Sequence, residues 1–160
     1  MYHSSQKIID EVFAHRRILS WRAMGDRIIF TNGCFDLIHP GHIDYLEKAA
    51  NLGERLVVGL NADVSVKKLK GENRPVMGEA GRARVLAALE FVDMVILFPE
   101  ETPLRLIEMV SPDVLVKGGD YQVEEIVGYE WVKKNGGEVI TIPLLSGYST
   151  TSTIEKLRGG

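Results

Sequence analysis

The chain has 160 residues, 45% of them hydrophobic and 26% charged, and its formal net charge is −3. This length predicts one domain with a substantial core, and the balance of charge gives no general basic field that would attract a nucleic acid. The apolar runs are far shorter than the roughly 20 residues of a membrane helix, and the polar N-terminus leads into no secretory signal. We expect a cytoplasmic protein without nucleic-acid or membrane partners.

Residues 4–22 carry apolar side chains at mostly helical spacing, which predicts one or two helices. The stretch Met24-Gly25-Asp26 then ends the helix and turns the chain into a first strand. We expect residues 1–26 to be an N-terminal helical extension used for packing or oligomer contact, and residues 27–160 to form the main domain. Together with the outer helices of the sheet, this extension offers a surface for a homodimer.

Continuous apolar runs predict five strands, which are typical of parallel sheets covered on both faces. These strands are expected at about residues 27–30, 55–60, 95–98, 114–116 and 139–142, with helices at about 40–52, 79–91, 103–110 and 124–134. Strands that alternate with helices predict an α/β fold, namely a single-domain, Rossmann-like, doubly wound sheet of five parallel strands. The ligand should lie beyond the carboxyl ends of the strands.

The turn after the first strand holds two histidines three residues apart, His39 and His42. His42 falls in the first turn of the following helix, where free backbone N–H groups and the helix dipole favour an anion. Pro40 suits the first helical position, and Gly41 lets a ligand approach the backbone closely. This pattern indicates a phosphate site, against the alternative of two ordinary surface histidines. Cys34, the single cysteine, is interpreted as a small packing residue.

Polar stretches follow other strands at the same predicted edge of the sheet. Three lysines between residues 67 and 70, together with Arg74, could form a mobile loop that closes over a triphosphate, or only a solvated loop. Residues 117–121 contain two glycines that could admit a base or ribose, or could simply form a turn. Ser149 to Thr153 offer a helix cap and a second phosphate cradle.

The string G-C-F-D-x-x-H-x-G-H at residues 33–42 resembles the H-x-G-H nucleotidyltransferase superfamily. Residues 149–151 resemble its second signature, although the basic residue of that signature would fall at Ile154 and the nearest cation is Lys156. Four stretches, 30–36, 69–76, 115–121 and 135–151, look like the adenylyltransferase domain of heptose-phosphate-activating enzymes in its stand-alone form. That likeness implies a separate heptose kinase.

The resemblance implies adenylyl transfer from ATP to a heptose 1-phosphate, which gives ADP-heptose and pyrophosphate for lipopolysaccharide precursors. It places catalysis on His39, His42 and Lys70. The implied nucleotide-binding residues are Thr31, Gly33, Phe35, Asp36, Gly41, Lys67, Lys68, Arg82, Lys117, Gly118, Ser149, Thr150 and Thr151, and the implied acceptor contacts are Asn61, Asp63 and Asp120.

Mg²⁺ is the expected cofactor, and because it would be bound mainly through phosphates, no metal-binding motif is needed. Arg82 could instead make only a surface ion pair, and Asn61 and Asp63 could be turn residues. Two other functions remain open for the chain: a glycerol-3-phosphate or other polyol cytidylyltransferase, and a non-catalytic nucleotide-binding sensor.

Overall fold

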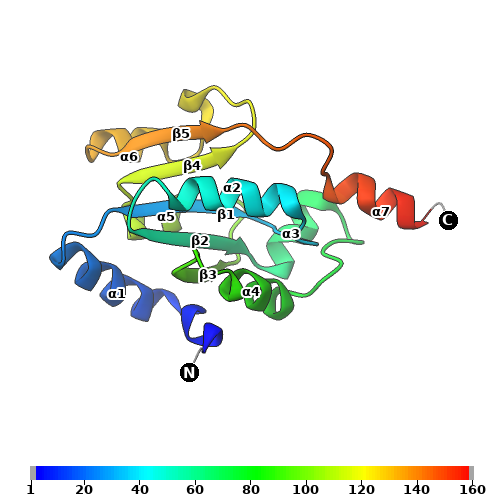
Figure 1. Cartoon of the computed structure of the whole chain (residues 1–160), viewed down its shortest axis with the longest axis horizontal. Coiled ribbons are helices and arrows are strands. Elements are labelled where there is room, and N and C mark those ends of the chain that lie inside the picture. The colour runs from blue at the N-terminus through cyan, green and yellow to red at the C-terminus, as the bar shows by residue number, and fades with distance from the viewer. Residues whose placement is uncertain (1–2, 159–160) are drawn as a thin grey trace.

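The computed structural model describes residues 3–158, and within them the strands form one fully parallel sheet (Figure 1). The strands are β1 (Ile28–Gly33), β2 (Arg55–Asn61), β3 (Met94–Phe98), β4 (Val114–Gly118) and β5 (Glu138–Ile142). They lie in the order β3-β2-β1-β4-β5, so that the direction of winding reverses between β1 and β4. The Rossmann-like α/β fold predicted from the sequence is confirmed.

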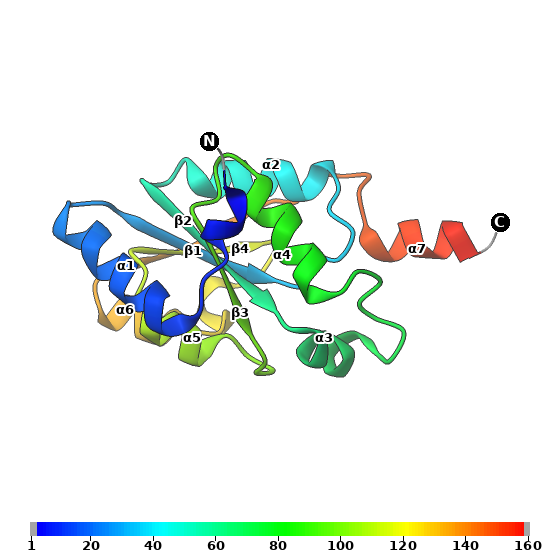
Figure 2. The same cartoon turned by 90° about the horizontal axis from the view of Figure 1, so that it is seen from below.

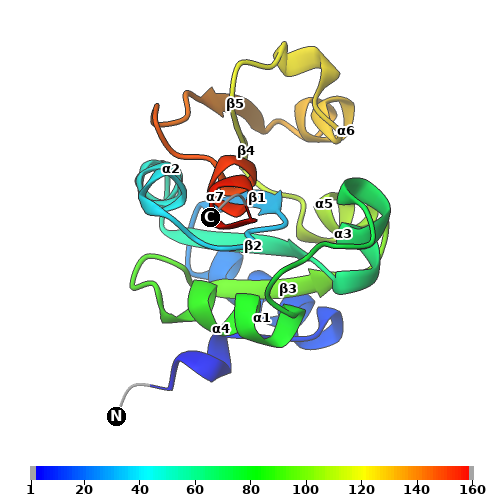
Figure 3. The same cartoon turned by 90° about the vertical axis from the view of Figure 1, so that its right-hand side faces the viewer.

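Helices connect the strands and cover both faces of the sheet (Figures 2 and 3). They are η1 (Ser4–Lys7), α1 (Glu11–Ala23), α2 (Pro40–Ala50), α3 (Asp63–Lys70), α4 (Glu79–Ala88), α5 (Leu104–Val110), η2 (Val123–Glu125), α6 (Tyr129–Lys134) and α7 (Thr150–Arg158). Within residues 3–158, none of these helices combines the length and the apolar character that a bilayer span requires.

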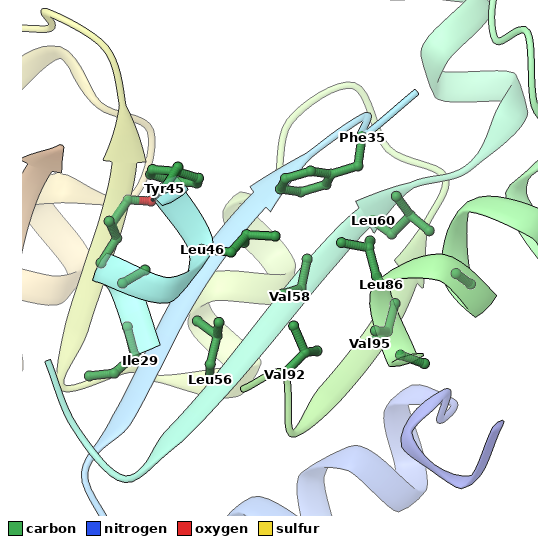
Figure 4. Packing of buried hydrophobic residues seen from close by; sticks show 14 of the residues in the cluster. Ile29, Phe35, Tyr45, Leu46, Leu56, Val58, Leu60, Leu86, Val92 and Val95 are labelled. Carbon is green, nitrogen blue, oxygen red and sulfur yellow. Dashed lines mark hydrogen bonds between the residues drawn. The ribbon is translucent and has the colours of Figure 1, made fainter. Parts of the chain in front are cut away.

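Two apolar clusters hold the layers together, one on each face of the sheet. Successive strand side chains point to opposite faces, so in β4 Val116 joins the cluster under α2 and α4 whereas Leu115 joins the cluster under α1, α5 and α6. Figure 4 shows the first cluster, in which Leu46 and Leu86 pack onto Val58 and its neighbours. Burial on both faces explains why the strand sequences lack polar alternation.

The N-terminal segment forms a short 3₁₀ turn and one helix, α1. Asp10 caps this helix by accepting a hydrogen bond from the Phe13 amide at 3.0 Å. Ala14, Ile18 and Trp21 are buried against the sheet, so α1 contributes to the core. The proposed domain boundary at residue 26 stays a prediction.

The structure corrects two expected boundaries. Lys67, Lys68 and Lys70 lie in the last turn of α3, where a mobile loop was expected, because burial of Val66 gives this charged segment a helical anchor. The helix expected at 124–134 begins only at Tyr129, since Gly128 adopts a left-handed conformation with φ 93°. The last helix, α7, begins at Thr150 and extends away from the carboxyl edge of the sheet (Figure 1).

Candidate active site at the carboxyl edge of the sheet

A pocket of about 770 Å³ lies at the carboxyl ends of β1 and β4. These two strands pair at Ile29 with Val114 and at Phe30 with Leu115, and they separate beyond those pairs. This is the point where the winding of the sheet reverses, which is where open α/β sheets bind their ligands. The end-on view in Figure 3 shows α2 on one side of this edge, α5 on the other and α7 in front of β1.

Most of the residues predicted for the site line this pocket. They are Gly33, Phe35, Asp36, His39, Gly41, His42, Asn61, Lys70, Lys117, Gly118, Ser149, Thr150 and Thr151. Six other predicted residues lie outside its lining, namely Thr31, Asp63, Lys67, Lys68, Arg82 and Asp120. Lys67 and Asp120 are exposed, and the contacts of the other four are described below.

The imidazole rings of His39 and His42 are stacked at the start of α2. The backbone N–H of His39 donates to His42 Nδ1 at 3.3 Å, so this nitrogen carries no proton and the neutral ring carries its proton on Nε2. Burial, together with the charge of His39, lowers the pKa of His42 to about 4. Burial also lowers the pKa of His39, whose Nδ1 is buried without a hydrogen-bond partner among the described residues. Both imidazoles line the pocket, and each neutral ring has one N–H that can donate to a ligand.

Thr31 and Tyr45 attach α2 to the sheet. The two hydroxyl groups are hydrogen-bonded to each other, and Tyr45 Oη also donates to the Val116 carbonyl at 3.2 Å. Burial raises the pKa of Tyr45 to about 12, so the phenol stays protonated. Thr31 is itself completely buried, which places it beneath the pocket rather than against a nucleotide.

Asp36 holds the segment that follows α3. Its carboxylate accepts hydrogen bonds from the Val76 amide at 2.8 Å, the Met77 amide at 3.0 Å and Arg74 Nε at 2.9 Å. Burial alone would raise the pKa of this carboxyl, but the two amides and Arg74 hold it below its usual value. Asp36 is thus engaged within the protein, and Arg74, which also lines the pocket, is oriented by it.

Arg82 lies outside the pocket lining and is hydrogen-bonded to residues that belong to it. Its side chain is fully buried and donates to the carbonyls of Met77, Cys34 and Asn61 at 3.0, 2.7 and 2.8 Å, and to Asp63 Oδ1 at 2.7 Å. The sequence predicted that Arg82 makes either a direct nucleotide contact or a surface ion pair. Neither prediction fits a side chain that is fully buried. Arg82 and Asp63 instead join the turn after β1, the end of β2 and the segment before α4.

The lysines at the carboxyl edge differ in what they face. Lys70 and Lys117 line the pocket, whereas Lys68 pairs with Glu101 at 3.4 Å and Lys67 is exposed outside the lining. Burial lowers the pKa of Lys117. Within residues 3–158, no carboxylate oxygen lies within 4.0 Å of the ammonium group of Lys70 or Lys117. Two uncompensated cations beside two helix N-termini make a site suited to phosphates.

The N-terminus of α7 closes one side of the pocket. Ser149 caps the helix, since its Oγ accepts from the Ser152 amide at 3.3 Å. Thr150 Oγ1 donates to the Asp36 carbonyl at 3.0 Å and ties α7 to the turn after β1. Ile154, where the superfamily signature has a basic residue, is buried, and Lys156 is exposed outside the pocket lining.

Several residues of the lining were missed from the sequence. They are Asn32, Tyr45, Leu69, Glu101, Thr102, Pro103, Val127, Leu144, Leu145 and Tyr148, together with Cys34, which was interpreted only as a packing residue. The segment after β3 could have been found, because it follows the carboxyl end of a predicted strand like the other loops. The apolar residues carry no comparable signal. Tyr148 stacks on His39 with ring centroids 5.9 Å apart.

Comparison with known proteins matches residues 30–156 to the cytidylyltransferase-like family. The chain belongs to the cytidylyltransferase-like family. It is 59% identical over 142 residues to the bifunctional protein HldE of Bradyrhizobium sp. (strain ORS 278), an alignment that covers 89% of this chain and 29% of that protein. The corresponding protein of Rhodopseudomonas palustris (strain BisB5) is 54% identical over 158 residues, 98% of this chain and 32% of that protein. The chain therefore spans about a third of the length of these relatives.

Two solved structures resemble this cytidylyltransferase-like domain. The lipopolysaccharide core biosynthesis protein from Thermoplasma volcanium GSS1 has a TM-score of 0.62 and 30% identity, covering 78% of this chain and 100% of that chain. Pantoate-beta-alanine ligase from Francisella tularensis has a TM-score of 0.62 and 18% identity, covering 94% of this chain and 76% of that chain, which is a likeness of fold. The resemblance indicated by the sequence motifs is confirmed.

The carboxylates near the site suit a metal that arrives with the nucleotide. Within residues 3–158, no group of three or more His, Cys, Asp or Glu side chains is placed to hold a metal ion. Asp36 and Asp63 are engaged by arginines, whereas Glu101 at the rim of the pocket makes only an exposed ion pair with Lys68 at 3.4 Å. Mg²⁺ bound to nucleotide phosphates usually keeps several waters and needs only one or two protein carboxylates, so the donor set fits such an ion.

Proposed function

We propose that this cytidylyltransferase-like chain transfers the adenylyl group of ATP to a heptose 1-phosphate, giving ADP-heptose and pyrophosphate. The observation that carries the proposal is the pair of neutral imidazoles at the N-terminus of α2, within one pocket that also holds Lys70, Lys117 and the N-terminus of α7. This arrangement collects donors for several phosphate groups, and the Cys34 thiol in the same lining stays protonated because burial raises its pKa. Family membership and the relatives named above support the same reaction.

In this reaction an oxygen of the sugar 1-phosphate attacks the α-phosphorus of ATP. The bond between that phosphorus and the bridging oxygen breaks, and pyrophosphate leaves with the bond's electron pair. Such chemistry depends on alignment and on stabilising the charge of the equatorial and leaving oxygens. His39 and His42 would donate hydrogen bonds to the α-phosphate oxygens, and Lys70 with Ser149 to Thr151 would hold the β- and γ-phosphates.

Mg²⁺ is proposed as the cofactor, held by the phosphates with Glu101 as the available protein carboxylate; when bound it would neutralise charge on the triphosphate. The protein's own residues perform the remaining tasks. Arg74, fixed by Asp36, would place a further cation beside the triphosphate. The turn after β1, held by Arg82, would bring the backbone of Gly33 close to the ligand.

The proposed product belongs to lipopolysaccharide precursor synthesis, and its sugar 1-phosphate would come from a separate heptose kinase. We also propose a cytoplasmic location and a homodimer. Val12, Phe13 and Leu19 on the outer side of α1 are exposed, which offers an apolar contact surface. Light scattering of the purified chain tests the dimer, and a monomer mass would contradict it.

The first experiment measures pyrophosphate release by the purified chain with Mg²⁺. ATP, CTP, GTP and UTP are each combined with both anomers of D-glycero-D-manno-heptose 1-phosphate and with glycerol 3-phosphate. Release confined to ATP with a heptose 1-phosphate would support the proposal and would identify the anomer. Release with CTP and glycerol 3-phosphate would instead establish a polyol cytidylyltransferase, and ATP binding without any release would indicate a sensor.

A further inference from the structure

The pocket extends over both faces of the sheet at its carboxyl edge. His39 and His42 lie at the N-terminus of α2, which covers one face, whereas Thr102 and Pro103 precede α5 on the other. Figure 3 shows these two helices on opposite sides of the sheet edge. A ligand pocket that spans both faces can hold two reactants that approach each other across the ends of β1 and β4.

Lys117 faces the α5 side, away from the imidazoles. In β4, Leu115 belongs to the cluster under α5 and α6, and Val116 belongs to the cluster under α2. Since strand side chains alternate between the faces, Lys117 returns to the side of Leu115. Lys117 therefore lines the pocket from the face opposite to the two histidines.

Asn32 lies on the same face of the neighbouring strand. Phe30 pairs with Leu115 in the register between β1 and β4, and Asn32 and Lys117 each lie two residues further along. A Cβ atom built on Gly59 would meet Phe30 Cζ at 2.8 Å, Leu106 Cδ2 at 3.1 Å and Asn32 Cβ at 3.3 Å, which places Asn32 on the α5 side. Asn32 and Lys117 thus flank the gap that opens where the two strands separate.

These residues suit an acceptor that carries both an anion and hydroxyl groups. Lys117 is half-buried, its pKa is lowered by burial, and no carboxylate oxygen among the described residues lies within 4.0 Å of its ammonium group. A partly buried cation without a protein partner is stabilised when a ligand supplies the anion. The amide of Asn32 can donate to one hydroxyl and accept from another. The buried Asn61, whose Nδ2 donates to Ser65 Oγ at 2.8 Å, continues this polar strip.

We infer that Lys117 binds the phosphate of the sugar 1-phosphate and that Asn32 orients the sugar hydroxyls, on the side of the sheet edge opposite to the imidazoles. This inference rests on the proposed function and names its acceptor subsite. It reassigns Lys117 from the nucleotide contact expected by resemblance. The geometry gives the two anionic substrates separate cations, Lys117 for the acceptor and Lys70 for the triphosphate, so their mutual repulsion is reduced during in-line attack.

The test measures steady-state pyrophosphate release with ATP and heptose 1-phosphate varied separately. Lys117→Met should raise the KM for heptose 1-phosphate roughly 10- to 100-fold, the loss of one charge-assisted contact, and should leave the KM for ATP within about threefold. Lys117→Arg should recover part of the loss because it keeps the charge. Asn32→Ala should raise the same KM by about tenfold. Lys133→Met, an exposed lysine of α6, is the matched control.

Thermal melting of each variant confirms that it is folded before the kinetics are compared. A rise in the KM for ATP with an unchanged KM for heptose 1-phosphate would overturn the inference and return Lys117 to the nucleotide. Equal losses for both substrates would overturn it as well. Absence of turnover by the wild-type chain with every heptose 1-phosphate would overturn the proposed function and this subsite together, so the two failures are distinguishable.

Discussion

The rings of His39 and His42 lie with their centroids 3.8 Å apart and their planes inclined by 21°. Two imidazolium ions at this separation would repel each other, and protonation of His42 Nδ1 would also remove its hydrogen bond from the His39 amide. The pair is therefore neutral at pH 7. Its N–H groups act as hydrogen-bond donors, and the positive charge of the site comes from lysine and arginine.

This arrangement predicts that the folded state loses stability as the pH falls. The pKa of His42 is about 4 in the folded chain and about 6.5 in the unfolded chain, so between these values the unfolded chain binds more protons. The stabilising effect is fully present above pH 6.5 and is lost as the pH falls toward 4. The lowered pKa of His42 corresponds to a loss of about 2 kcal/mol in unfolding free energy between pH 7 and pH 5. Partial solvent screening reduces this expected loss to about 1 kcal/mol.

Urea denaturation at pH 7 and pH 5 measures this loss for the wild-type chain and for His42→Asn. The difference between the two proteins isolates the contribution of His42, because the other titrating groups are common to both. An equal loss of unfolding free energy in both proteins would show that His42 titrates normally. His15→Asn, on the exposed side of α1, should behave like the wild type.

His39→Ala should lower kcat by roughly 10²- to 10³-fold, the usual loss when one transition-state donor is removed, with little change in ATP affinity. The reason is that the neutral N–H gains strength only as charge develops on the phosphate oxygens. Pyrophosphate release gives kcat, and equilibrium binding of ATP gives the affinity. A near-normal kcat would exclude His39 from the reaction, and His15→Ala serves as the control.

The sequence predicted the sheet and the two histidines because both signals are local. Buried parallel strands read as continuous apolar runs, and a strand, a glycine turn and a helix can be recognised around His39 and His42 without knowledge of distant contacts. The fold class and the position of the imidazoles therefore followed from short stretches of the chain.

The position of Arg82 could not be predicted in the same way. Its acceptors on Cys34 and Asn61 lie 48 and 21 residues away in the chain, and two of its three bonded backbone carbonyls become neighbours only after the sheet has formed. Likewise, Asn32 and Lys117 share a face only through the register of β1 with β4. Leu144 and Leu145 enter the pocket through an irregular segment, which no periodic pattern describes.

The lysines of α3 should differ in their effects on catalysis. Lys70 lines the pocket, whereas Lys67, one helical turn earlier, does not. Lys70→Ala should lower kcat/KM for ATP roughly 10- to 100-fold through loss of a charge-assisted phosphate contact. Lys67→Ala should change it less than about twofold, since a solvated charge outside the pocket is screened. Equal losses in the two variants would mean that α3 acts only through its general positive charge.

Arg82 should contribute to stability rather than to direct ATP contact. Arg82→Met would leave one buried and two part-buried carbonyls without their donor and Asp63 without its partner, so we expect a loss of about 3–5 kcal/mol in unfolding free energy. Arg82→Lys should recover little of this loss, because an ammonium group cannot reach the four acceptors that a guanidinium spans.

The matched control is Arg84→Met, two residues along the same helix, where the side chain is exposed and donates to Ser4 Oγ at 3.0 Å. It should change the unfolding free energy by less than about 0.5 kcal/mol. Urea denaturation measures both variants, and ATP binding is compared below the onset of unfolding. If Arg82→Met kept wild-type stability and lost ATP affinity, the side chain would have to leave its buried acceptors and contact the nucleotide directly.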